Sequence, residues 1–325
     1  MLNIWRKATG RKSQGPELGG MPLGDHPWLV LGGGGLKGLT HLGVWRALEE
    51  AGFRPDGILG TSIGSLVGAC MAAEVDRGKL EKHARALSRS DIARVQRRAV
   101  WFNGLRATSV FQGEVLRDYL EGVLPDTGWE ALRIRFQLNA VEMGRGRTEW
   151  FGIGARTDVP LPDAVYASNA LPVFYPPARL PGGIYADGGV EDALPLRRAA
   201  ELGATSVVAV DVGSGEEADA EEVLRQGLLG MHQRVFGIMS GRRRRDQIAS
   251  WDGPPLLLIR PRLDNYGTFD FEHVEYFLEE GYRATVAVLR GEEEEENRGG
   301  DERVEAEAAA LGAVNAGPGG EPESG

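Results

Sequence analysis

The chain has 325 residues, 42% of them hydrophobic, and a formal net charge of −10. This length and composition allow a sizeable core and exclude a fibrous or wholly disordered chain. Cys70 is the single cysteine, so an intrachain disulfide is excluded, and we expect it to be packed in the apolar segment SLVGACMAA. No stretch reaches the roughly 18 apolar residues of a membrane-spanning helix.

The charge divides the chain into three expected regions. Residues 291–325 carry 11 acidic and 2 basic residues and few large apolar ones, which predicts a disordered acidic tail. Residues 1–24 are basic without an apolar signal core and are expected to form a flexible leader. Residues 25–290 contain no linker and should form one domain. We expect a cytoplasmic location, peripheral to a membrane, and no nucleic-acid partner.

Within this domain, short apolar runs alternate with segments of helical periodicity. Helices are predicted over residues 39–52, where Gly52 is a stop signal, and over 62–74. Strands are predicted over 26–31, 56–60, 134–143, 147–154, 206–213 and 254–261. Strands that alternate with helices predict an α/β fold with three α/β/α layers and a mostly parallel central sheet.

The first strand ends in four glycines, and two interpretations of them are open. Gly33, Gly35 and Gly38 fit G-x-G-x-x-G between a strand and a helix, as in a dinucleotide-binding domain. That site also needs an acidic residue at the end of the second strand, but Asp56 lies at its start. The alternative is that the glycine N–H groups bind the oxyanion of a reaction intermediate.

The second strand ends in Gly60-Thr-Ser62-Ile-Gly64, a G-x-S-x-G sequence before a helix of small residues. This is the context of a nucleophile elbow, in which a sharp turn exposes a serine hydroxyl. The flanking glycines are required because side chains there would collide across the turn. A glycine-lined turn with an incidental serine is the competing interpretation.

A serine nucleophile needs a base, and the sequence offers an aspartate for this role. Asp187 follows an apolar run and precedes Gly188 and Gly189, which allow a tight turn and leave room for a neighbour. A D-G-G hairpin is the competing interpretation. No histidine lies in a loop after a late strand, so we expect packing or surface roles for His26, His41, His83, His232 and His273.

Three motifs, GGGGLKG, GTSIG and DGG, occur in this order and resemble the patatin-like phospholipase family; the segment YASNALPVFYPP is also similar. The resemblance spans about residues 27–213. It implies hydrolysis of ester-linked acyl chains of phospholipids or other lipids by a dyad of Ser62 and Asp187, without histidine, metal or cofactor. It further implies an oxyanion hole from the N–H groups of Gly33, Gly34 and Gly35, with Lys37 close to it.

The chain departs from the family at Ala193, where the family often has asparagine. A hydrogen bond behind Asp187 is then missing or supplied by Asp192. This departure keeps a third hypothesis open, a non-catalytic relative that binds lipid or a protein partner.

Three further segments carry weaker signals about the substrate and the surface. Residues 101–124 could form an acyl-binding wall or cover, although ordinary core packing is the simpler expectation. The basic segments 82–98 and 241–247 are predicted to be helical and could contact anionic headgroups, with a solvated face as the default.

Overall fold

The computed structural model describes residues 15–96, 107–125, 128–213 and 219–292. The strands of its main sheet are β3 (Pro27–Leu31), β4 (Gly57–Gly60), β5 (Arg135–Glu142), β6 (Arg147–Gly152), β7 (Ala178–Leu180), β8 (Gly183–Asp187), β9 (Ser206–Val210) and β10 (Leu256–Ile259). Their order is β10-β9-β3-β4-β5-β8-β7, and β6 also pairs with β5. The pairings from β10 to β5 are parallel, so the predicted mostly parallel sheet is confirmed.

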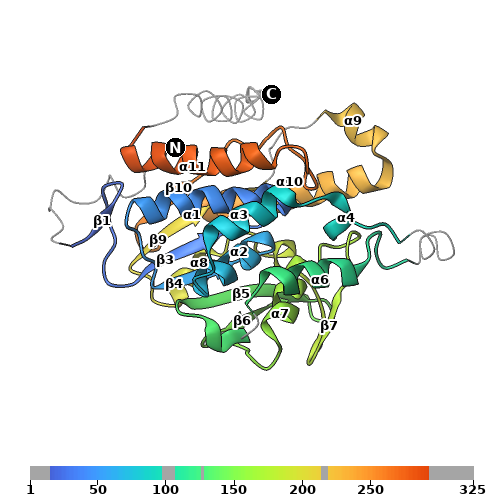
Figure 1. Cartoon of the computed structure of the whole chain (residues 1–325), viewed down its shortest axis with the longest axis horizontal. Coiled ribbons are helices and arrows are strands. Elements are labelled where there is room, and N and C mark those ends of the chain that lie inside the picture. Colours follow the sequence, from blue (N-terminus) through green and yellow to red (C-terminus); the bar gives the residue numbers. More distant parts are fainter. Residues whose placement is uncertain (1–14, 97–106, 126–127, 214–218, 293–325) are drawn as a thin grey trace, which may run out of the picture.

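Helices connect and cover these strands (Figure 1). They are α1 (Thr40–Glu50), α2 (Ile63–Ala72), α3 (Arg77–Ala86), α4 (Arg89–Ile92), α6 (Gly113–Val123), α7 (Leu161–Asn169), α8 (Leu196–Glu201), α9 (Ala220–Arg225), α10 (Gly227–Ala249) and α11 (Val274–Arg290). Short 3-10 helices in the described part of the chain are η2 (Gly35–Leu39), η4 (Gly128–Ala131) and η5 (Gly188–Val190).

Within the described residues, buried apolar side chains form two separate cores, one on each face of the sheet. Leu29 and Leu31 of β3 belong to the larger core with residues of α1, α2 and α11. Trp28 and Val30 of the same strand belong to the smaller core with α8 and Ile248 of α10. Because successive side chains of a strand point to opposite faces, helices cover both faces of the sheet. Figure 1 shows α1 and α11 packed side by side.

The N-terminal segment differs from the expected flexible leader where the structure describes it. Residues Glu17–Leu18 (β1) and Met21–Pro22 (β2) pair antiparallel around Gly19 and Gly20, both with positive φ. Leu18, Met21 and Leu23 are buried. The prediction of a flexible leader is therefore wrong for residues 17–23. Three buried apolar side chains hold this segment against the domain, and they are too few to resemble the apolar core of a signal peptide. Residues 1–14 and 293–325 lie outside the described residues.

The basic segment 82–98 was expected to be helical and is broken where the structure describes it. Helix α3 ends before Leu87, which has an extended backbone, and α4 begins after Ser88. The Ser88 and Asp91 side chains form a capping box, which satisfies backbone N–H groups at a new helix start.

Two predictions about apolar segments can be compared with the described residues. Cys70 is a buried free cysteine, and burial raises the pKa of its thiol to about 12, as expected for a packed side chain. None of the helices in the described part of the chain combines the length and apolar character needed to cross a bilayer.

Candidate active site

The turn between β4 and α2 holds Ser62 in a strained conformation. Ser62 has φ 53° and ψ −129°, a region that costs a non-glycine residue about 1–3 kcal/mol. The Ser62 N–H donates to the Ser168 Oγ at 2.9 Å, and the Asn169 Nδ2 donates to the Ser62 carbonyl at 3.0 Å. These two bonds from the end of α7 hold the turn, and a nucleophile elbow has this geometry.

The glycines of the elbow are required by close backbone approaches. A Cβ on Gly60 would lie 2.4 Å from the Gly64 carbonyl oxygen, and one on Gly64 would lie 2.2 Å from the Leu31 carbonyl oxygen. A Cβ on Gly38 would lie 1.8 Å from the Ile63 Cγ2. The glycine loop, the elbow and the start of α2 therefore pack as one unit.

Replacing Gly64 by Ala should destabilise the fold by roughly 1–3 kcal/mol, because a backbone oxygen cannot move away as a flexible side chain can. The matched control is Gly122→Ala in α6, where an added Cβ would meet no described heavy atom within 4 Å beyond its chain neighbours and the backbone of its own helix. That change should stabilise by ~0.5–1 kcal/mol through helix propensity. Urea unfolding of both variants measures the effect; equal stability of the two would contradict this packing.

The register of β5 explains why Asp187 meets Ser62 across 125 residues of sequence. On one side of β5, β6 pairs along Gln137–Glu142. On the other side, β4 pairs parallel up to Leu138, and β8 pairs antiparallel from Ala140 onward. The carboxyl ends of β4 and β8 therefore face each other along the same edge of β5. Asp187, the last residue of β8, lies opposite Ala140 at this junction.

The two predicted site residues are in direct contact. The Ser62 Oγ donates to the Asp187 Oδ2 at 2.7 Å, and the Gly189 N–H donates to the Asp187 Oδ1 at 2.7 Å. Burial raises the pKa of the Asp187 carboxyl to about 7, against the lowering effect of these two hydrogen bonds. Near neutral pH this carboxyl group can therefore accept a proton, which an ordinary aspartate does poorly.

The glycine loop lies beside this pair, but its three glycines are not equivalent. A Cβ on Gly33 would lie 3.2 Å from the Ser62 Cβ, which places the loop against the candidate nucleophile. The Gly33 N–H donates to the Ala193 carbonyl at 2.9 Å, so Gly33 is not a free oxyanion donor in this conformation. Within the described residues, nothing accepts a hydrogen bond from the Gly34 or Gly35 N–H. Of the three expected oxyanion donors, Gly34 and Gly35 therefore remain candidates in this conformation.

Lys37 is part of a buried charged cluster and does not line the pocket. Its side chain is fully buried, and burial lowers its pKa to about 8, with a further lowering from Arg244. Asp211 and Asp264 act in the opposite direction. Asp211 also pairs with the Arg244 Nε at 3.0 Å. Of this cluster, Arg244 lines the pocket, whereas Lys37 is not one of its lining residues.

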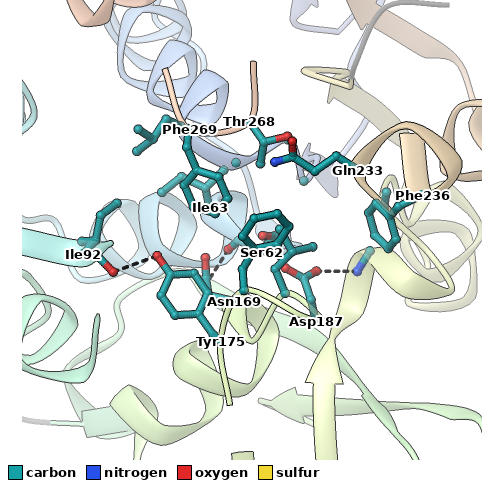
Figure 2. A pocket seen from close by; sticks show the side chains of 18 of the residues that line it. Ser62, Ile63, Ile92, Asn169, Tyr175, Asp187, Gln233, Phe236, Thr268 and Phe269 are labelled. Carbon is teal, nitrogen blue, oxygen red and sulfur yellow. Dashed lines mark hydrogen bonds between the residues drawn. The ribbon is translucent and has the colours of Figure 1, made fainter. Parts of the chain in front are cut away.

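A pocket opens over Ser62 and Asp187, as Figure 2 shows. Its walls come from the glycine loop, α2, the α3–α4 region, α6, residues 169–175, residues 187–193, α10 and the Phe269 loop. The apolar wall includes Leu66, Leu87, Ile92, Leu116, Leu120 and Phe269. Leu116 and Leu120 of α6 belong both to this wall and to the larger core, so the described part of residues 101–124 packs in the core and also lines the pocket. Residues 101–106 lie outside the described residues.

The histidines are distributed as expected, with one exception. His41 is fully buried, its Nε2 bonds the Gly32 carbonyl at 2.8 Å, and burial lowers its pKa to about 4. His232 of α10 lines the pocket, and among the described residues its buried Nε2 has no hydrogen-bond partner. Its ring lies against Phe174 and Phe236. In the described part of the chain, no group of three His, Cys, Asp or Glu side chains is placed to hold a metal ion.

Sequence reasoning did not identify the residues that position the dyad. Ser168 and Asn169 hold the elbow, and their signal was present in the segment YASNALP. The Gly189 N–H donates a hydrogen bond to the Asp187 carboxylate. The sequence had suggested that a hydrogen bond behind Asp187 is either missing or supplied by Asp192. The Asp192 carboxyl instead accepts from the Leu194 N–H and Gln247, so that assignment is wrong.

A strained serine between a strand and a helix, bonded to a buried carboxyl group, defines a candidate serine hydrolase of the α/β type. The family model described as patatin-like phospholipase matches residues 29–200, more than half of the chain, and the chain belongs to this family. The match favours the hydrolase interpretation of the glycine loop over the dinucleotide alternative.

Three curated relatives illustrate the similarity. Patatin-like phospholipase domain-containing protein 6 of Mus musculus is 28% identical over 89% of this chain and 22% of its own length. Lysophospholipase NTE1 of Yarrowia lipolytica is 28% identical over 83% of this chain and 20% of its own length. An NTE family protein of Mycobacterium tuberculosis is 31% identical over 60% of this chain and 51% of its own. The chain spans about a fifth of the length of the first two.

Proposed function

We propose that this protein is a serine acyl hydrolase that cleaves ester-linked acyl chains of lipids. The observation that carries the proposal is the 2.7 Å hydrogen bond from the Ser62 Oγ to the buried Asp187 carboxylate at an apolar pocket. The relative named lysophospholipase supports lipid esters as the substrate class. We further propose a cytoplasmic location with peripheral contact to anionic membranes.

In the proposed reaction, the Ser62 Oγ attacks the ester carbonyl carbon while Asp187 takes its proton. The carbonyl oxygen becomes an oxyanion that accepts hydrogen bonds from the Gly34 and Gly35 N–H groups, each worth about 2.7–4 kcal/mol in such sites. Asp187 then gives the proton to the departing alcohol oxygen, which leaves an acyl-serine. Water attacks this ester with Asp187 again as base, and the fatty acid and Ser62 are released.

The apolar wall of the pocket is suited to bind the acyl chain of this substrate. The six aliphatic or aromatic side chains of this wall line the same pocket as Ser62 and the glycine loop. Burying hydrocarbon against such a wall contributes about 25 cal/mol per Å² of apolar surface. Binding energy from the chain can therefore position the ester beside the Ser62 Oγ.

The direct test is release of free fatty acid from lysophosphatidylcholine and phosphatidylcholine, alongside hydrolysis of p-nitrophenyl butyrate as a soluble ester. The full chain should hydrolyse the soluble ester and at least one of the lipids. A folded protein that binds these lipids and hydrolyses none of the three esters would instead match the non-catalytic relative.

The pH dependence should follow the Asp187 carboxyl group. Its raised pKa of about 7 means that the proton-accepting form is lost as pH falls through that value. We expect kcat/KM for the soluble ester to fall about ten-fold per pH unit below about pH 7 and to be flat above it. A rate that stays constant down to about pH 5 would show that a group with an ordinary aspartate pKa is the base.

A further inference from the structure

Helix α10 carries an unusual concentration of exposed apolar side chains. Seven of the twelve large hydrophobic residues that are exposed in the described chain lie between residues 224 and 239. Five of them on α10 form what we call the α10 stripe, with exposed fractions of 78, 42, 48, 49 and 55%: Leu228, Met231, Val235, Ile238 and Met239. Leaving this much apolar surface in water is unfavourable, and such patches mark sites of interaction.

The spacing places the α10 stripe on one side of the helix. Its five residues follow one another at steps of three, four, three and one positions, so they span about 100° around the helix axis. This is about the width of the apolar stripe of an amphipathic helix. Another side of the same helix lines the pocket over Ser62, through His232, Phe236 and Ser240. Figure 2 shows the Phe236 ring close to Asp187. One helix therefore connects an exposed apolar surface to the wall of the site.

The charges of α10 favour an anionic lipid surface. The helix contains five arginines and one aspartate. Arg243 donates to the Val190 carbonyl and Arg244 pairs with Asp211, so both have structural roles. Arg242 lies seven residues after Val235, on the same line as the stripe. Its side chain is 79% exposed, and its Nε lies 3.9 Å from the Asp246 carboxylate. An arginine at the end of an apolar stripe can reach phosphate headgroups while the stripe contacts hydrocarbon.

We infer that the α10 stripe is the surface by which this protein docks on a lipid bilayer, bringing the pocket over Ser62 to the membrane interface. The inference rests on the proposed lipid substrate. A second copy of the chain fits the stripe less well, because a stable dimer uses roughly 20–30 residues a side. Five side chains on one helix face are instead enough for an interfacial contact, which scales with buried apolar area and attraction to anionic lipids.

The test is sedimentation of the full chain with vesicles of phosphatidylcholine and phosphatidylglycerol. The variant is the triple change Leu228→Gln, Val235→Gln and Met239→Gln. None of these side chains lines the pocket, and glutamine preserves helix propensity. We expect the triple variant to lose ~10-fold or more of the vesicle partition coefficient. Its hydrolysis of p-nitrophenyl butyrate should remain unchanged, which also shows that it is folded.

The matched control is Met143→Gln with Ile153→Gln, because these side chains, which directly follow β5 and β6, are exposed to a similar extent, 53 and 45%. The control should bind vesicles as the wild type does. Equal vesicle binding by the triple variant would overturn the inference, as would conversion of a wild-type dimer to a monomer with vesicle binding unchanged. Failure of the proposed function looks different: the wild type would sediment with vesicles but hydrolyse no ester.

Discussion

Replacing Ser62 by Ala should lower kcat/KM for every ester substrate by ~10⁴-fold or more, because the residual rate then comes only from substrate binding and the oxyanion donors. The variant should fold normally, since alanine keeps the Cβ and the backbone strain of the turn is unchanged. Hydrolysis of p-nitrophenyl butyrate measures the loss, and circular dichroism monitors the fold.

The control for this variant is Ser90→Ala on α4, where the serine is exposed and bonds only Ser88 among the described residues. It should hydrolyse esters at the wild-type rate. A Ser62→Ala variant that retains more than a few per cent of the wild-type activity would contradict the assignment of the nucleophile.

Replacing Asp187 by Asn should lower kcat/KM by ~10²–10⁴-fold, the contribution of a positioned general base. The amide can still accept the Gly189 N–H bond and donate to the Ser62 Oγ, so the local geometry should be retained. It cannot accept the Ser62 proton. The pH profile of the residual rate should also lose the inflection near pH 7 that belongs to the carboxyl group.

The same substitution should stabilise the protein at neutral and higher pH. The folded-state pKa of Asp187 is raised from 3.8 to about 7, so the folded protein holds this proton more tightly than the unfolded chain does. The wild type therefore loses stability as pH rises from about 4 to about 7, whereas asparagine does not titrate. The difference in unfolding free energy between the variant and the wild type should be larger at about pH 8 than at about pH 4. A difference independent of pH would mean that the carboxyl pKa is not raised.

The local part of the site could be predicted from the sequence. The β4–α2 turn could be predicted because G-x-S-x-G lies between an apolar run and a helix of small residues. Steric limits leave few other backbone conformations for such a turn. The start of α4 also had a readable signal, since Ser88 and Asp91 have capping-box spacing, but the apparent helical periodicity of the segment concealed it.

The long-range part of the site could not be predicted in the same way. The meeting of Ser62 and Asp187 depends on β4 and β8 sharing one edge of β5, and strand register depends on contacts distant in sequence. The Gly33 N–H is occupied by the Ala193 carbonyl, a partner 160 residues away. Similarly, only the packed structure shows which face of α10 stays exposed.

The most direct test of the central claim is covalent labelling of the full chain with a fluorophosphonate probe, followed by mapping of the modified peptide by mass spectrometry. The account predicts one labelled residue, Ser62, with labelling abolished in Ser62→Ala and slowed in Asp187→Asn. Folded protein that remains unlabelled, or is labelled at another serine while Ser62 stays unmodified, would contradict it.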